Sequence, residues 1–257
     1  MSFTLSMSRD IPGTNMTNAS IAGEALDAPA KDDPYSDAQS IEFRFRARRF
    51  AHVQRLIETI FAERDRADII DLGGTETYWR IGADFIRANR RRLTITMVNP
   101  EPQAIQDREV FSFLKGSATD PALFADRSFD LVHSNSVIEH VGSWQAMRDF
   151  AANARRLAPR YYIQTPNFWF PYEPHFRFPG FQYLPASVRA QMIMHFSLGF
   201  FRRIDDRDEA IDIIRHHRLL STREMRGLFS DAAVFHEKAF GLNKSIIALR
   251  DEAPSAD

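Results

Sequence analysis

Apolar and polar positions alternate along this chain with two different periods. Apolar side chains recur at helical spacing over residues 41–63, and short apolar or β-rich runs follow as candidate strands. These runs are 69–72, 93–98, 110–114, 128–134 and 160–165. Helical stretches are expected between them. One follows the first strand and ends near residue 90, a short one lies near 102–107, and a third is capped by Ser143 and ended by Pro159. Regular alternation of strands and helices predicts a parallel, doubly wound α/β sheet.

The alternation breaks after residue 165. Residues 166–218 are rich in aromatic residues and proline, with helices expected at 185–198 and 207–217, which predicts a helical, aromatic-rich cap insertion over the sheet. A capping box at residues 221–224 then opens a further helix, and residues 233–240 and 245–249 read as a final strand pair. The expected organisation is a flexible tail over 1–38, one domain over 39–251 and a short tail over 252–257.

Composition narrows the class of protein. The chain has 257 residues, of which 44% are hydrophobic and 26% charged, enough for one globular domain with a full core. The formal net charge of -1 does not favour a nucleic-acid partner. There is no cysteine, which excludes disulfides and thiolate chemistry and fits a reducing compartment. No stretch approaches the roughly 20 apolar residues that span a bilayer, so we expect a cytoplasmic protein.

Candidate chemistry begins where the first strand ends. Residues 69–79 run from a buried-type strand into Asp71, then the adjacent Gly73 and Gly74, then Thr75. A tight glycine turn at the carboxyl end of a first strand lets backbone N–H groups approach a nucleotide-like cofactor. The turn lacks the third glycine of a dinucleotide fingerprint, and no acid ends the second strand, which disfavours an NAD-dependent enzyme. The turn alone does not choose the cofactor.

Several linked segments together carry a family resemblance. They are the glycine turn at 71–74, Val98 and Asn99 at the second strand's end, residues 116–118, residues 129–141, and the final pair around 240–248. Over about 45–250 the chain resembles the class I S-adenosylmethionine-dependent methyltransferases of the ubiquinone and menaquinone methyltransferase type. The implied fold is a Rossmann-like, seven-stranded, mostly parallel sheet. Residues 165–175 resemble bacterial members that act on small-molecule or saccharide-related acceptors.

The resemblance implies that S-adenosylmethionine is the cofactor, with S-adenosylhomocysteine as product. The implied cofactor-binding residues are Asp71, Gly73, Gly74, Thr75, Asn99, Ser117, Ala118 and Asn135. Asp71 would hold the methionine end of the cofactor or, alternatively, only brace the turn. Asn99 and Ser117 stand where the family often has acids, and Thr75 stands where it often has a glycine. These departures keep a second hypothesis open: a catalytically inactive pseudo-methyltransferase that binds the cofactor and acts as a regulatory partner.

Methyl transfer to oxygen or nitrogen needs positioning of the acceptor and, for a hydroxyl or protonated amine, a base. The candidates are His140, in the turn after the fourth strand, and His175 with Glu173 in the cap. His140 could instead fix the turn by hydrogen bonds, and His175 could serve only in cap packing. We expect no metal site, because His216 and His217 point apart on a helix and the acidic run at 205–209 lacks a calcium-loop glycine. The acceptor and the oligomeric state stay open.

Overall fold

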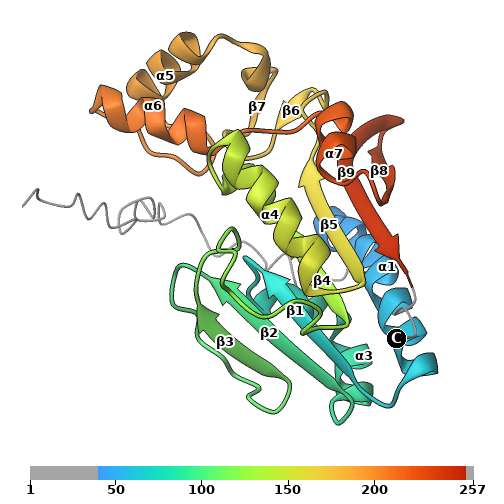
Figure 1. The fold of residues 1–257 in the computed structure, drawn as a ribbon. Coiled ribbons are helices and arrows are strands. Elements are labelled where there is room, and N and C mark those ends of the chain that lie inside the picture. The colour runs from blue at the N-terminus through green and yellow to red at the C-terminus, as the bar shows by residue number, and fades with distance from the viewer. Residues whose placement is uncertain (1–39, 253–257) are drawn as a thin grey trace, which may run out of the picture.

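The computed structural model describes residues 40–252. Its centre is one seven-stranded sheet in the order β3-β2-β1-β4-β5-β9-β8 (Figure 1). The strands are β1 (Ala67–Leu72), β2 (Leu93–Asn99), β3 (Phe111–Lys115), β4 (Leu131–Asn135), β5 (Arg160–Pro166), β8 (Ala233–Ala239) and β9 (Leu242–Asp251). β1 to β5 pair in parallel, and β9 runs antiparallel to both β5 and β8. The doubly wound, mostly parallel sheet expected from the sequence is therefore confirmed.

Helices cover both faces of the sheet. They are α1 (Ile41–Glu63), α2 (Glu76–Trp79), α3 (Ala83–Asn89), α4 (Trp144–Leu157) and α7 (Thr222–Leu228), with short 3-10 turns η1 (Arg80–Gly82) and η2 (Ile138–His140). In Figure 1, α4 crosses one face of the sheet, whereas α1 and α3 lie behind it. Each layer has its own apolar core, one beneath α4 and α7 and one beneath α1 to α3. Central strands buried on both faces explain the continuous apolar runs in the sequence.

Two helix starts show how local sequence positions the site. Ser143 caps α4 by accepting a hydrogen bond from the backbone N–H of Ala146, 3.1 Å away. Ser221 and Glu224 form the expected capping box at the start of α7. Each cap satisfies N–H groups that the first helical turn cannot pair, typically worth about 1 kcal/mol. Both helix starts lie beyond the carboxyl ends of the strands, which is the edge where the cap begins.

The cap follows β5 and is built around its own apolar cluster. It contains β6 (Tyr172–Glu173), β7 (Phe178–Pro179), η3 (Phe181–Tyr183), α5 (Ala186–His195) and α6 (Arg207–His216). α5 and α6 lie against each other beyond the sheet edge, where Phe176, Phe181 and Ile193 are buried between them. The two cap helices therefore lie within the ranges expected from the sequence.

The structure corrects one expected element and leaves two untested. No helix forms at 102–107; instead the Glu76 carboxylate accepts hydrogen bonds from the backbone N–H groups of Gln106 and Asp107, at 2.6 and 3.2 Å. That loop is pinned by a residue about 30 positions earlier, which local periodicity does not reveal. The expected tail over 1–38 and residues 253–257 of the expected tail over 252–257 lie outside the described residues. Within the described part of the chain, no helix is long and apolar enough to cross a membrane.

Candidate functional site

The glycine turn sits tightly between two strand ends. The Gly73 N–H donates to the Val98 carbonyl at 2.7 Å, and Gly73 has a φ of +77°, which L side chains rarely adopt. A Cβ atom on Gly73 would lie 2.4 Å from Val137 Cγ1, and one on Gly74 would lie 1.9 Å from Asp71 Oδ2. Neither position can hold a side chain without local movement. The turn therefore presents bare backbone at the carboxyl end of β1.

Asp71 ends β1 with its carboxylate turned into the protein. Its side chain is 1% exposed, and it accepts a hydrogen bond from Trp79 Nε1 at 2.8 Å through Oδ2. Oδ1 lies 2.7 Å from His133 Nδ1 on β4. Both oxygens thus have protein partners, as the alternative role of bracing the turn requires. A direct or water-mediated contact of Asp71 with the cofactor stays a prediction.

Asn99 ends β2 and bonds back to the glycine turn. Its Nδ2 donates to the carbonyl oxygen of Gly73 at 3.2 Å, and its Oδ1 accepts from the Glu101 backbone N–H at 3.0 Å. An acid at this position, as in the usual family pattern, could not donate to the Gly73 carbonyl. The amide thus has a structural use here, joining the ends of β1 and β2.

The remaining cofactor candidates lie on three neighbouring segments. Thr75 is the residue before α2, whereas Ser117 and Ala118 follow β3, with the Ser117 hydroxyl 2.8 Å from that of Thr119. Asn135 ends β4 and is half-buried. Its Oδ1 is buried and accepts no hydrogen bond from any of the residues the structure describes. A buried acceptor without a partner is costly, so Asn135 Oδ1 is suited to a ligand donor at this edge.

Four ionisable side chains from distant segments converge beside this edge. Glu139 and His140 lie on η2, His175 lies between β6 and β7, and His217 follows α6. The ring centroids of the three histidines are 4.7 to 5.1 Å apart. The backbone N–H of Arg218 donates to the Glu139 carbonyl at 3.1 Å, which ties the end of α6 to η2. The two predicted catalytic histidines, His140 and His175, are therefore neighbours.

Glu173 lies behind His175 in this group. It is 2% exposed; its Oε1 lies 2.7 Å from His175 Nδ1 and its Oε2 accepts from the Phe176 backbone N–H at 2.6 Å. Because both oxygens are engaged, Glu173 can orient His175 and hold its Nδ1 protonated. This geometry makes it a positioning residue for His175.

Burial sets the protonation of the group. Desolvation raises the pKa of Glu139 to about 7, and it lowers the pKa of His217 to about 4. The pKa of His140 falls well below its usual value, mainly through burial and then through the neighbouring histidines. Burial alone would also lower the pKa of His175, but the hydrogen bond and charge of Glu173 outweigh it and raise that pKa. His140 and His217 are therefore neutral near pH 7, with a lone pair to offer.

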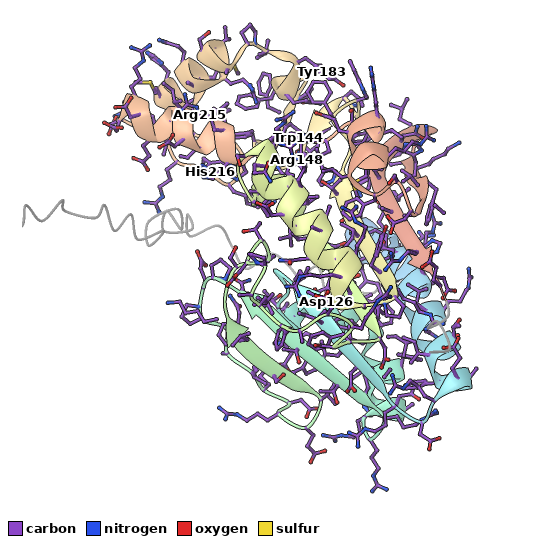
Figure 2. All side chains as sticks on the ribbon, in the orientation of Figure 1. Asp126, Trp144, Arg148, Tyr183, Arg215 and His216 are labelled. Carbon is purple, nitrogen blue, oxygen red and sulfur yellow. The ribbon has the colours of Figure 1, made fainter. Side chains whose placement is uncertain are left out.

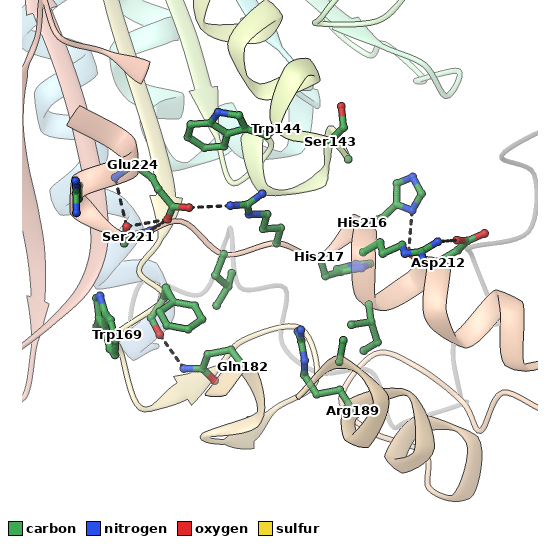
Figure 3. Close-up of a pocket in the computed structure, with 18 residues that line it drawn as sticks. Ser143, Trp144, Trp169, Gln182, Arg189, Asp212, His216, His217, Ser221 and Glu224 are labelled. Carbon is green, nitrogen blue, oxygen red and sulfur yellow. Dashed lines mark hydrogen bonds and ion pairs between the residues drawn. The ribbon is translucent and has the colours of Figure 1, made fainter. Parts of the chain in front are cut away.

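A large cavity opens next to this group. Its volume is about 1110 Å³, and it lies between the start of α4, the end of α6, the start of α7 and the cap. His216 lies next to the segment before α4 here, because a Cβ atom on Gly142 would be 3.5 Å from His216 Cδ2; Figure 2 labels His216 and Trp144 in this region. Figure 3 shows Trp144 on one side, Trp169 and Gln182 on the cap side, and Arg189 reaching from α5 towards the middle. His217 connects this cavity to the histidine group.

The sequence missed three contributors to this region. Trp144 and Arg189 line the cavity, and His217 packs against both His140 and His175. The aromatic-rich cap expected over 166–218 also contributes Phe168, Trp169 and Gln182 to the cavity wall. His217 is 77 positions from His140 in the chain, and nothing in its immediate sequence signals the contact. Of the three, only Trp144 had a signal in the sequence: it directly follows the Ser143 helix cap, shortly after η2.

Comparison with known proteins gives one family match. Residues 81–160 match the family model described as a methyltransferase domain; this range holds β2, β3, β4, η2 and α4 and ends at the first residue of β5. The match covers less than half of the chain and begins after the glycine turn. No curated protein matches the sequence. The match and the fold support an S-adenosylmethionine-dependent methyltransferase, with S-adenosylmethionine as cofactor.

Similar solved structures are distant in sequence. An O-methyltransferase family protein from Burkholderia thailandensis is 16% identical with a TM-score of 0.44; the match covers 83% of this chain and 59% of that one. The 1,6-didemethyltoxoflavin-N1-methyltransferase of Burkholderia thailandensis, solved with 1,6-didemethyltoxoflavin and S-adenosylhomocysteine, is 15% identical with a TM-score of 0.46, over 89% and 94%. A SAM-dependent methyltransferase from Aquifex aeolicus is 8% identical with a TM-score of 0.45, over 86% and 98%. At these scores the likeness says nothing about the acceptor.

Proposed function

We propose that this protein transfers the methyl group of S-adenosylmethionine to an oxygen or nitrogen of a small-molecule or saccharide-related acceptor that binds in the cavity beneath the cap. The proposal rests on one observation above all: the cavity of about 1110 Å³ is lined by Gly142, shortly after η2, and by His217, whose ring packs against that of His140 on η2. In doubly wound folds, ligands bind at the carboxyl edge of the sheet. The proposed unit is the domain over 39–251, with 166–218 as its cap, in the cytoplasm.

The cofactor side of the edge fits the donor. Gly73 and Gly74 place backbone without side chains at the end of β1, and the unpartnered Asn135 Oδ1 can accept from the cofactor's amino or hydroxyl groups. The residues proposed to contact it are Gly73, Gly74, Thr75, Asn99, Ser117, Ala118 and Asn135. Asp71 is proposed to act mainly by holding the turn, because its oxygens already bond Trp79 and His133.

The chain's own contribution to the chemistry is positioning and proton handling. When bound, the cofactor's sulfonium supplies an electrophilic methyl group. His140 has 35% of its side chain exposed and packs against His217, which lines the cavity, so His140 is the group proposed to contact the acceptor and take up its proton. His175, oriented by Glu173, lies against His140 and can hold it in place.

The cavity wall indicates the kind of acceptor. Apolar faces are supplied by Trp144, Phe168 and Trp169, and the guanidinium groups come from Arg189, Arg215, Arg218 and Arg223. Aromatic faces suit a ring or the apolar face of a sugar, and arginines suit carboxylate or phosphate groups. We therefore propose an acceptor that combines a ring with an anionic substituent.

The proposal is tested by methyl transfer from labelled S-adenosylmethionine to a panel of phenols, N-heterocycles, sugars and their acidic derivatives. Turnover that favours acidic ring compounds over their neutral counterparts is the expected result. Cofactor binding without turnover on the whole panel would instead favour the regulatory, inactive alternative.

The Asn135→Ala variant tests the cofactor contact. Since Asn135 Oδ1 has no partner in the described part of the protein, truncation should leave the free energy of unfolding close to that of the wild type. The lost hydrogen bond should weaken S-adenosylhomocysteine binding by roughly 3- to 10-fold in calorimetry. Unchanged affinity would remove Asn135 from the cofactor site.

A further inference from the structure

The group beside the cavity has the composition of a metal site. One ligand atom each from Glu139, His140 and His175 lie within 4.8 Å of one another. Glu139 Oε1 is 4.0 Å from His140 Nε2, which is too long for a hydrogen bond. Two ligand atoms that each lie about 2.1 Å from one ion are at most about 4.2 Å apart. The Glu139–His140 pair already meets this limit, and the 4.8 Å spread of the group exceeds it by about 0.6 Å, so small side-chain shifts would bring all three atoms within reach of a single ion.

Glu139 supplies the independent sign that something is bound here. Its side chain is fully buried; Oε2 accepts from the Thr165 hydroxyl at 2.9 Å, while Oε1 has no hydrogen-bond partner in residues 40–252. Oε1 lacks a partner whether the carboxyl is ionised or protonated, because neither a donor nor an acceptor lies within reach. Such an atom carries a desolvation cost that a cation would remove.

The surrounding hydrogen bonds orient the histidines as metal ligands are oriented. His175 Nδ1 is held by the Glu173 carboxylate at 2.7 Å, which leaves Nε2 as the free nitrogen. A carboxylate on the far nitrogen of a ligating histidine fixes its tautomer and raises its basicity. His217 Nδ1 is held by the Ile213 carbonyl at 2.7 Å, and its ring packs against those of His140 and His175.

We propose that Glu139, His140 and His175 bind one divalent transition-metal ion beside the cavity, next to His217, with Glu173 as the supporting carboxylate of His175. Two imidazoles and one carboxylate favour Zn²⁺, Fe²⁺ or Co²⁺ over Mg²⁺ and Ca²⁺, which prefer oxygen ligands. Three protein ligands leave coordination positions open towards the cavity. This departs from the expectation, based on His216–His217 and the acidic run alone, that the chain has no metal site.

With the ion bound, the lone pair of His140 is used in coordination, so the ion would replace His140 as the means of lowering the barrier to loss of the acceptor proton. An acceptor oxygen in an open position would have its pKa lowered by the metal, so that less basic groups suffice to deprotonate it. This consequence rests on the proposed function. The binding of the ion is independent of the proposed function, because its three ligands come from η2 and the cap whatever the acceptor is.

The test is metal binding by the untagged full chain, stripped with a chelator and titrated with Zn²⁺ in a calorimeter and with Co²⁺ in a visible spectrometer. No cofactor or acceptor is present, so failure of the proposed function would leave this result unaffected. We expect one ion per chain. Glu139→Gln and His175→Ala should each weaken binding by at least about 100-fold, and Glu173→Gln by about 10- to 100-fold.

His195→Ala is the matched control. On α5, His195 Nδ1 lies 2.7 Å from the carbonyl oxygen four residues earlier, as His217 Nδ1 does on α6, and His195 is not one of the three proposed metal ligands. It should bind the ion like the wild type. Thermal unfolding shows which variants fold, and His140→Ala replaces Glu139→Gln if the latter does not. The proposal is overturned if the wild type binds no ion, or if the folded variants bind it as tightly as the His195→Ala protein.

Discussion

Replacing Asp71 with alanine is expected to lower the free energy of unfolding by about 2–5 kcal/mol, because each of two buried groups loses its hydrogen-bond partner at a cost of about 1–3 kcal/mol. The change leaves Trp79 Nε1 without its acceptor. It also leaves His133 with neither ring nitrogen bonded, since His133 Nε2 already lacks a partner among the described residues. Urea unfolding, followed by circular dichroism, measures the loss.

Asp84→Ala is the matched control, because the Asp84 carboxylate is 97% exposed and pairs only with Arg87 on the surface of α3 among the contacts described. Its unfolding curve should overlay that of the wild type. An Asp71→Ala protein of normal stability that has lost cofactor affinity would show that Asp71 is a cofactor ligand and not a brace of the turn.

Replacing His140 with alanine is expected to reduce kcat by about 100- to 10,000-fold, the usual contribution of a positioned acid or base. The affinity for S-adenosylhomocysteine should stay close to that of the wild type. The reason is position: the His140 ring packs against those of His175 and His217, while the glycine turn lies at the end of β1. Steady-state kinetics and calorimetry on the same preparation measure the two effects.

His195→Ala again serves as the control and should retain both activity and affinity. If His140→Ala loses affinity and turnover in equal measure, His140 holds the turn in shape and handles no acceptor proton. That outcome would return His140 to the purely structural role that the sequence left open.

Most of the fold could be predicted from the sequence, because helix caps and apolar runs are local sequence features. Ser143 and the Ser221–Glu224 capping box marked helix starts, and the apolar runs of β1, β2, β4 and β5 marked strands that are buried on both faces. The expected helix at 102–107 failed for the opposite reason. Its backbone is held by Glu76, a partner about 30 residues away that leaves no trace in local periodicity.

The sequence predicted the site residues that lie at the carboxyl ends of strands. Asn99 and Asn135 end β2 and β4, so parallel pairing brings them to one edge with Gly73. The histidine group depends instead on how the cap folds back. The sequence offered His140 and His175 as separate candidates, but the contact of His217 with both, and the Glu139 oxygen left unpaired between them, required three-dimensional packing. Asp71 shows the same limit, because its partners Trp79 and His133 come from a helix and another strand.

The central claim is that the edge formed by the glycine turn and Asn135 binds the methyl donor. Calorimetric titration of the untagged chain with S-adenosylhomocysteine tests it most directly, with Asn135→Ala measured alongside. The account predicts one site per chain, with affinity weakened in the variant. No detectable binding of S-adenosylhomocysteine or S-adenosylmethionine by the folded wild-type protein at high concentration would contradict it.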